Sequence, residues 1–173
     1  GEEAAALKIA LEASLRAINR DGLESRRVKE VGNAVEPLVI AALESAGFAA
    51  DRPTAVSGKQ RSAGYPDLEA SRAGCFFYFE IKTYNPRTEN STQRTFYLSP
   101  SDDPKVTHAA FHLLIAFAIE PSEDGKYYAK SAQLVDLNDL PVKLKIEYNA
   151  SNRDLYQRAD PLLKIEASAQ DLD

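Results

Sequence analysis

The feature that most constrains the fold is the stretch 65–82, in which two strand-like segments flank Ala73 and Gly74. A two-residue loop with Gly74 at positive φ predicts a β-hairpin, and its register places Arg72 opposite Cys75. The second segment is apolar on both of its faces, as is typical of a central strand that is covered on two sides. We therefore expect this hairpin to lie in the middle of a β-sheet.

The same register brings charged side chains together. Asp67 lies opposite Glu80, and Lys82 follows on the face of Glu80 because strand side chains alternate with a period of two. Opposed side chains have Cβ atoms roughly 5 Å apart, where two like charges destabilise the pair, so the two acids need a cation or a shared proton. Carboxylate oxygens are ligands that Mg²⁺ prefers. Two interpretations stay open on these residues alone: a metal site, with Glu69 as an alternative ligand or a solvent-facing acid, or an ordinary hairpin in which Lys82 is a local counter-ion.

Helical periodicity precedes the hairpin. Apolar residues at helical spacing predict a helix over 2–19 and a second helix that ends at Gly47. Glu36 lies at the edge of the apolar stripe of the second helix, where it could lean over the neighbouring sheet or act as a capping residue three positions after Asn33. Pro37 removes a helical hydrogen bond, which predicts a kink or restart near Asn33.

The rest of the chain is predicted to alternate between strands and one more helix. The predicted elements are a strand from Phe48 to Val56, a polar excursion from Thr83 to Pro100, a short helix from Asp103 to about Phe111, strands over Leu113–Ile119 and Tyr127–Leu137, and a half-buried strand over 142–148. The short helix is expected because Asp103 and Pro104 have the character of a cap and a first helical residue. Polar excursions of the length of 83–100 are usually functional or disordered.

Two short motifs carry a resemblance to a known family. Pro66-Asp67 followed by Glu80-Ile81-Lys82 resembles the signature of the PD-(D/E)xK nuclease superfamily, and Glu36 resembles its upstream glutamate. The resemblance implies a restriction-endonuclease-like α/β fold, with an αβββαβ core over residues 30–120 and helices that flank a central mixed β-sheet. The length of 173 residues suits one domain over 1–173, in which an N-terminal helix in 1–22 and C-terminal strands and a tail in 121–173 flank this core.

The resemblance also implies an activity, that of a restriction-endonuclease-like, Mg²⁺-dependent DNA endonuclease in which Mn²⁺ substitutes for Mg²⁺. Asp67, Glu80 and the backbone carbonyl of Ile81 would hold the ion. Lys82 would position the attacking water and offset charge in the transition state, and Glu36 would orient the water or assist a second metal. The alternatives on the same fold are a non-catalytic DNA- or partner-binding protein and a junction-resolving or repair nuclease.

The charge distribution indicates where DNA would bind. The net charge of −5 argues against a protein that coats nucleic acid without specificity. Between residues 52 and 94, however, seven Lys and Arg stand against four Asp and Glu. Cations bind phosphate, whereas Arg, Asn and Gln read base edges. The candidate DNA contacts are Lys59, Arg61, Arg87, Gln93, Arg94 and Lys105.

Assembly and location are expectations of the same kind. Cutting both strands of a duplex would imply a homodimer, and the first predicted helix is the obvious surface for one. The single cysteine, Cys75, fits a reducing cytoplasm. No apolar run approaches the roughly 20 residues of a membrane span, and the N-terminus lacks the apolar region of a signal peptide. We therefore expect a cytoplasmic protein that binds DNA and no membrane.

Overall fold

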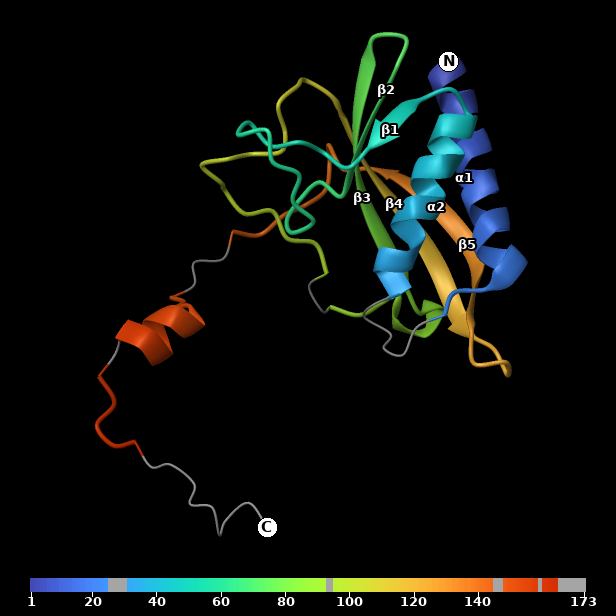
Figure 1. The fold of residues 1–173 in the computed structure, drawn as a ribbon. Helices are drawn as coiled ribbons and strands as arrows, with labels where there is room; N and C mark the ends of the chain where they lie inside the picture. The colour runs from blue at the N-terminus through green and yellow to red at the C-terminus, as the bar shows by residue number, and fades with distance from the viewer. Residues whose placement is uncertain (25–30, 93–94, 145–147, 159, 165–173) are drawn as a thin grey trace. The chain divides into compact units, whose positions relative to one another are not determined.

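Five strands form one mixed sheet in the order β1-β2-β3-β4-β5 (Figure 1). They are β1 (Ala49–Asp51), β2 (Leu68–Arg72), β3 (Cys75–Tyr84), β4 (Phe111–Pro121) and β5 (Tyr127–Asp136). β3 and β4 are parallel, and the other neighbours are antiparallel. The predicted hairpin thus supplies the central strand, β3, which confirms its expected place in the sheet.

This computed structural model describes residues 1–24, 31–92, 95–144, 148–158 and 160–164. The chain separates into two compact units, Gly1–Leu140 and Pro141–Asp173. The first unit contains the sheet, both helices and every described residue of the candidate site. In the second unit the described residues include one short π-helical turn, η3 (Asp154–Arg158). The prediction of a single domain over 1–173 stays a prediction.

Two helices pack on one face of the sheet and build the core there. Helix α1 (Glu2–Asp21) and helix α2 (Val31–Ser45) lie side by side on the same side of the strands (Figure 1). Alternate residues of β3, namely Phe77, Phe79 and Ile81, are buried in the same apolar cluster as both helices. The packing follows from the 3.6-residue and two-residue periods of the apolar positions. The expected α/β fold class, helices flanking a central mixed sheet, is confirmed.

The opposite face of β3 carries Tyr78, Glu80 and Lys82 and is covered by irregular chain. Tyr78 is almost fully buried, and its hydroxyl accepts a 2.9 Å hydrogen bond from the backbone amide of Thr107. Phe76, nearer the hairpin turn, is 40% exposed. The central strand is therefore covered on two sides around Glu80, but by loops on this side rather than by a helix.

The predicted helix from Asp103 to Phe111 is wrong. The described residues between β3 and β4 contain a short 3₁₀ turn, η2 (Pro86–Thr88), and no α-helix. The physical reason is that the Asp103 carboxylate accepts hydrogen bonds from the backbone amide (2.8 Å) and the hydroxyl (2.7 Å) of Ser57 and pairs with Arg61 at 2.9 Å. Because its carboxylate is bound to Ser57 and Arg61, Asp103 does not cap the backbone amides of its own first turn as a helix N-cap would. The αβββαβ order therefore lacks its second helix here.

Smaller corrections concern the strand ends. β1 is shorter than the predicted strand from Phe48 to Val56, and the described part of 142–148 is not a strand. A half-buried strand needs a paired neighbour that covers its apolar side, whereas the side chains of Val142 and Leu144 are highly exposed.

Strand β5 pairs with β4 along its length, so part of 121–173 belongs to the sheet. The helix α2 runs through Pro37 without a restart near Asn33. None of the described helices is long and apolar enough to cross a membrane.

Candidate metal-binding active site

The turn of the β2–β3 hairpin sets the register of the site. Ala73 and Gly74 have φ values of 50° and 81°, which is the combination that a two-residue type I′ turn requires. Arg72 then pairs with Cys75, as the sequence predicts, and the ladder continues to the pair of Leu68 with Phe79. The regular ladder ends at this pair, and Asp67 and Glu80 stand directly beside it, Asp67 before Leu68 and Glu80 after Phe79. A slip of one residue would send Glu80 into the helix-side core.

Asp67 is anchored to the strand that carries the other acid. Its backbone amide donates a 2.9 Å hydrogen bond to the carbonyl of Phe79, and its Oδ2 accepts a 2.8 Å bond from the backbone amide of Ile81. One carboxylate oxygen of Asp67 is therefore held against the backbone of β3. This contact ties the Pro-Asp motif to the Glu-x-Lys motif.

Glu80 is a buried carboxylate with one free oxygen. It is 5% exposed, and its Oε1 lies 2.5 Å from Nζ of Lys82. Burial raises the pKa of the Glu80 carboxyl, while the Lys82 ammonium lowers it and the Asp67 carboxylate raises it. Oε2 of Glu80 is buried and has no hydrogen-bond partner among the described residues. Such an oxygen is costly unless a cation or a donor satisfies it.

This donor set fits a hard divalent cation. Two carboxylates, one of them with an unpartnered oxygen, match the preference of Mg²⁺ for one or two protein carboxylates and several waters. The described part of the chain holds no cluster of three or more Asp, Glu, His or Cys side chains suited to a metal. Both side-chain donors are carboxylates, and oxygen ligands are those that Mg²⁺ prefers, whereas structural zinc sites use mainly nitrogen and sulfur.

Glu36 lies on α2 and is engaged by a residue that the sequence did not suggest. Its Oε2 lies 3.1 Å from a guanidinium nitrogen of Arg52, which follows β1. Burial lowers the pKa of the Lys105 ammonium, and the Glu36 carboxylate is one of the nearby charges that act in the opposite direction. The described partner of Glu36 is therefore a side chain and not the amides of its own helix.

The candidate DNA contacts do not share one environment. Lys59 and Arg87 are exposed, whereas Arg61 is paired with Asp103 and also donates to the Asp103 carbonyl. Lys105 is 5% exposed, which argues against the direct DNA contact that the sequence predicts for it. The reason is that the segment expected to be a surface helix is instead folded against the loop that precedes Asp67. Gln93 and Arg94 lie outside the described residues.

Sequence reasoning missed a pair of polar aromatic residues beside the acids. The hydroxyl of Tyr65 lies 2.6 Å from Nδ1 of His112, and the two rings are stacked. Burial raises the pKa of the Tyr65 phenol, and the charges of Glu80 and Asp67 raise it further. The position of Tyr65 two residues before Asp67 was a visible signal, but the partner on β4 could be found only in the fold.

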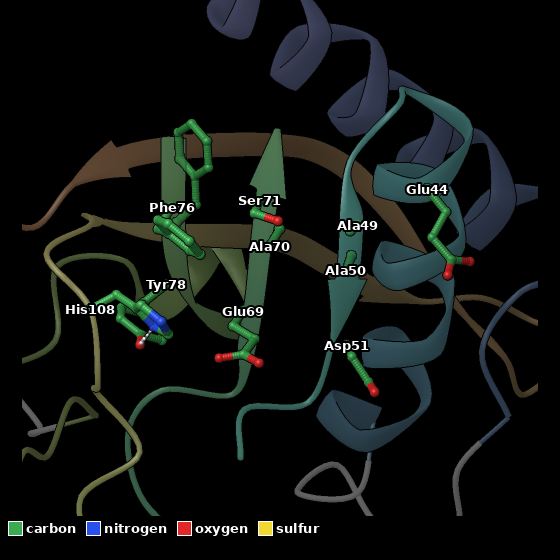
Figure 2. Close-up of a pocket in the computed structure, with 11 residues that line it drawn as sticks. Glu44, Ala49, Ala50, Asp51, Glu69, Ala70, Ser71, Phe76, Tyr78 and His108 are labelled. Carbon is green, nitrogen blue, oxygen red and sulfur yellow. Dashed lines mark hydrogen bonds between the residues drawn. The ribbon is translucent and has the colours of Figure 1, made fainter. Parts of the chain in front are cut away.

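A hollow of about 320 Å³ lies on the same hairpin. Figure 2 shows Glu69 and Asp51 along it and Phe76, Tyr78 and His108 at its other side. Burial raises the pKa of the Glu69 carboxyl; His108 lowers it and Asp51 raises it. Glu69 is half-buried and lines this hollow, and neither Asp67 nor Glu80 does.

A mixed sheet with a Pro-Asp and Glu-x-Lys site on its central hairpin defines a restriction-endonuclease-like protein of the PD-(D/E)xK superfamily. The chain belongs to the type II restriction enzyme MjaV family, whose family model matches residues 3–159. It is 42% identical over 148 residues to the type II restriction enzyme MjaV of Methanocaldococcus jannaschii, an alignment that covers 80% of this chain and 64% of that enzyme. The chain thus spans less than two thirds of the length of this relative.

Proposed function

We propose that the chain is a metal-dependent endodeoxyribonuclease that hydrolyses phosphodiester bonds in DNA. The observation that carries this proposal is the buried Glu80 carboxylate, which has Lys82 on one oxygen and no described partner on the other. Membership of a family of type II restriction enzymes supports DNA as the substrate. An uncompensated buried charge is costly, and a metal ion held by Glu80 would compensate it.

Each residue of the motif has a distinct role in this proposal. Asp67, Glu80 and the Ile81 carbonyl would hold Mg²⁺, or Mn²⁺ in its place, which supplies charge to the scissile phosphate and lowers the pKa of the attacking water. Lys82 orients that water and offsets the negative charge that develops on the phosphate. The bond from the Ile81 amide keeps the Asp67 carboxylate in position. Glu36, on α2, would orient the attacking water or assist a second metal ion.

The proposal extends to the DNA-binding surface and the assembly. Lys59 and Arg87 are exposed cations in the first unit and would contact phosphates, and Gln93 and Arg94 keep their predicted role. Arg61 would support the loop through Asp103 rather than bind DNA freely. A homodimer would cut both strands of a duplex, and the free thiol of Cys75 suits the reducing cytoplasm.

The test is cleavage of a long unmethylated DNA of mixed sequence with Mg²⁺ or with chelator. We expect discrete fragments with Mg²⁺, and none with chelator. Asp67→Asn should give none either, because Asn can still accept the Ile81 hydrogen bond but lacks the charge that holds a cation. Wild-type protein that binds this DNA yet leaves it intact with both Mg²⁺ and Mn²⁺ would support a binding protein instead.

Glu36→Gln tests the role assigned to α2. We expect cleavage to fall about 10- to 100-fold, the usual size of effects from groups outside the metal's direct ligands, and thus less than for Asp67→Asn. Arg52→Gln is the matched variant, because it breaks the same ion pair while leaving the Glu36 charge in place. Equal losses in the two variants would mean that Glu36 acts only through Arg52. Wild-type rates in Glu36→Gln would remove Glu36 from the site.

A further inference from the structure

Lys105 is a buried lysine in the irregular segment between β3 and β4. It is 5% exposed, and its ammonium donates a 2.7 Å hydrogen bond to the carbonyl of Pro66 and a 3.2 Å bond to the carbonyl of Arg61. Lysine is rarely buried this fully unless its charge is compensated. Both of these acceptors belong to the loop that leads into Asp67.

The bond to Pro66 completes the support of Asp67. The carboxylate is held on one side by the Ile81 amide, and the backbone amide of Asp67 is held by the Phe79 carbonyl. Lys105 fixes the peptide group directly before Asp67 from a third direction. This contact adds a restraint from the loop side to the two that β3 supplies, and it limits where the Asp67 carboxylate can lie.

The positive charge of Lys105 lies near the carboxylates of the candidate metal site. Burial lowers the pKa of the ammonium, the carboxylates of Asp67, Glu80 and Glu36 raise it, and the Arg61 guanidinium lowers it. The three acids assigned to the site are therefore the anions near this cation. An exposed lysine that bound DNA phosphate would have neither this burial nor these neighbours.

We propose that Lys105 is a positioning residue of the metal site, which holds Asp67 in place through the Pro66 carbonyl. This inference rests on the proposed function, because it assumes that Asp67 is a metal ligand. It assigns to the segment between β3 and β4 a part in metal binding, although that segment supplies none of the ligands.

Two effects of removing Lys105 have opposite signs, which makes the proposal testable. Loss of a nearby positive charge by itself strengthens the attraction of the carboxylates for a divalent cation. Loss of positioning weakens metal binding, by about 10- to 100-fold for groups that orient ligands. If Lys105 acts mainly by holding Asp67 in position, the metal affinity of the variant should fall even though a positive charge that repels the cation has been removed.

The experiment measures Mn²⁺ binding without DNA, by the electron paramagnetic resonance of the free ion, for wild type and Lys105→Met. We expect the dissociation constant of the variant to rise about 10- to 100-fold, and the Mg²⁺ concentration for half-maximal cleavage to rise with it. Near-wild-type cleavage at saturating Mg²⁺ should return, because the ligands themselves are intact. Lys126→Met is the matched control, since Lys126 also donates to a backbone carbonyl, that of Asp21 at 2.8 Å, and pairs with Glu24.

Lys126→Met should leave Mn²⁺ binding unchanged. A folded Lys105→Met protein that binds Mn²⁺ as tightly as wild type, or more tightly, would overturn the proposal. If that variant does not fold, Lys105→Arg keeps the charge and alters the reach, and unchanged Mn²⁺ affinity would then overturn it. Asp67→Asn distinguishes failure of the Lys105 proposal from failure of the proposed function. If wild type and Asp67→Asn bind Mn²⁺ with equal affinity, Asp67 is not a metal ligand and the proposed metal site is wrong.

Discussion

Lys82→Ala should reduce DNA cleavage by at least about 100-fold, the loss usual for one electrostatic group at a transition state, while most DNA affinity remains. The ammonium lies beside the Glu80 carboxylate, where the attacking water and the scissile phosphate would meet. One cation among several phosphate contacts contributes little to binding. Folding should survive, because the Lys82 side chain is 34% exposed and leaves no closed cavity.

The same variant should also change the pH dependence of residual cleavage. The Lys82 ammonium lowers the pKa of the Glu80 carboxyl, so its removal lets that pKa rise further. A metal ligand must be deprotonated, and the residual activity should therefore require a higher pH than the wild-type activity. Cleavage rates across a pH series, with DNA binding followed by fluorescence anisotropy, measure both effects.

Lys130→Ala is the matched control for this experiment. Lys130 is likewise a lysine on the sheet that pairs with a glutamate, Glu120, at 3.5 Å, but it lies on β5, outside the candidate site. Its removal should leave both rate and pH profile unchanged. A Lys82→Ala protein that cleaves as fast as wild type would refute the role given to this lysine.

Glu80→Gln should abolish cleavage and at the same time stabilise the metal-free protein. Burial raises the pKa of the Glu80 carboxyl in the folded state, so its contribution to stability is present below the ordinary pKa and is lost as pH rises through the raised one. At neutral pH the ionised carboxylate therefore costs stability. Its replacement by a neutral amide of the same shape should add about 0.5–2 kcal/mol to the free energy of unfolding.

Thermal unfolding in chelator, at neutral pH and at a pH below the ordinary pKa of glutamate, tests this sign. The advantage of Glu80→Gln should be present at neutral pH and should disappear in acid, where the wild-type side chain is also neutral. Glu120→Gln, at a more exposed glutamate that also pairs with a lysine, should show no comparable gain. A Glu80→Gln protein that melts below wild type at neutral pH would mean that the Lys82 ion pair outweighs the cost of burial.

The sequence by itself determined the hairpin and the two helices before it. Ala73 and Gly74 predict a two-residue turn, and turn length sets the pairing of every residue along β2 and β3. The apolar periods of α1 and α2 predict which faces are buried. These signals are local, because the residues that decide them are neighbours in the chain. Asp67, Glu80 and Lys82 could be predicted as a group for the same reason.

The tertiary structure alone decided the surroundings of that group. Asp103 has the sequence character of a helix cap, but its carboxylate accepts a hydrogen bond from Ser57, 46 positions away, and the expected helix does not form. Lys105 has the character of a surface cation, yet it is buried and donates a hydrogen bond to the carbonyl of Pro66, 39 positions away. Glu36 pairs with Arg52, a residue 16 positions away that its local sequence does not indicate. These outcomes depend on competition between distant partners, and local sequence patterns contain no information about which partner is nearer.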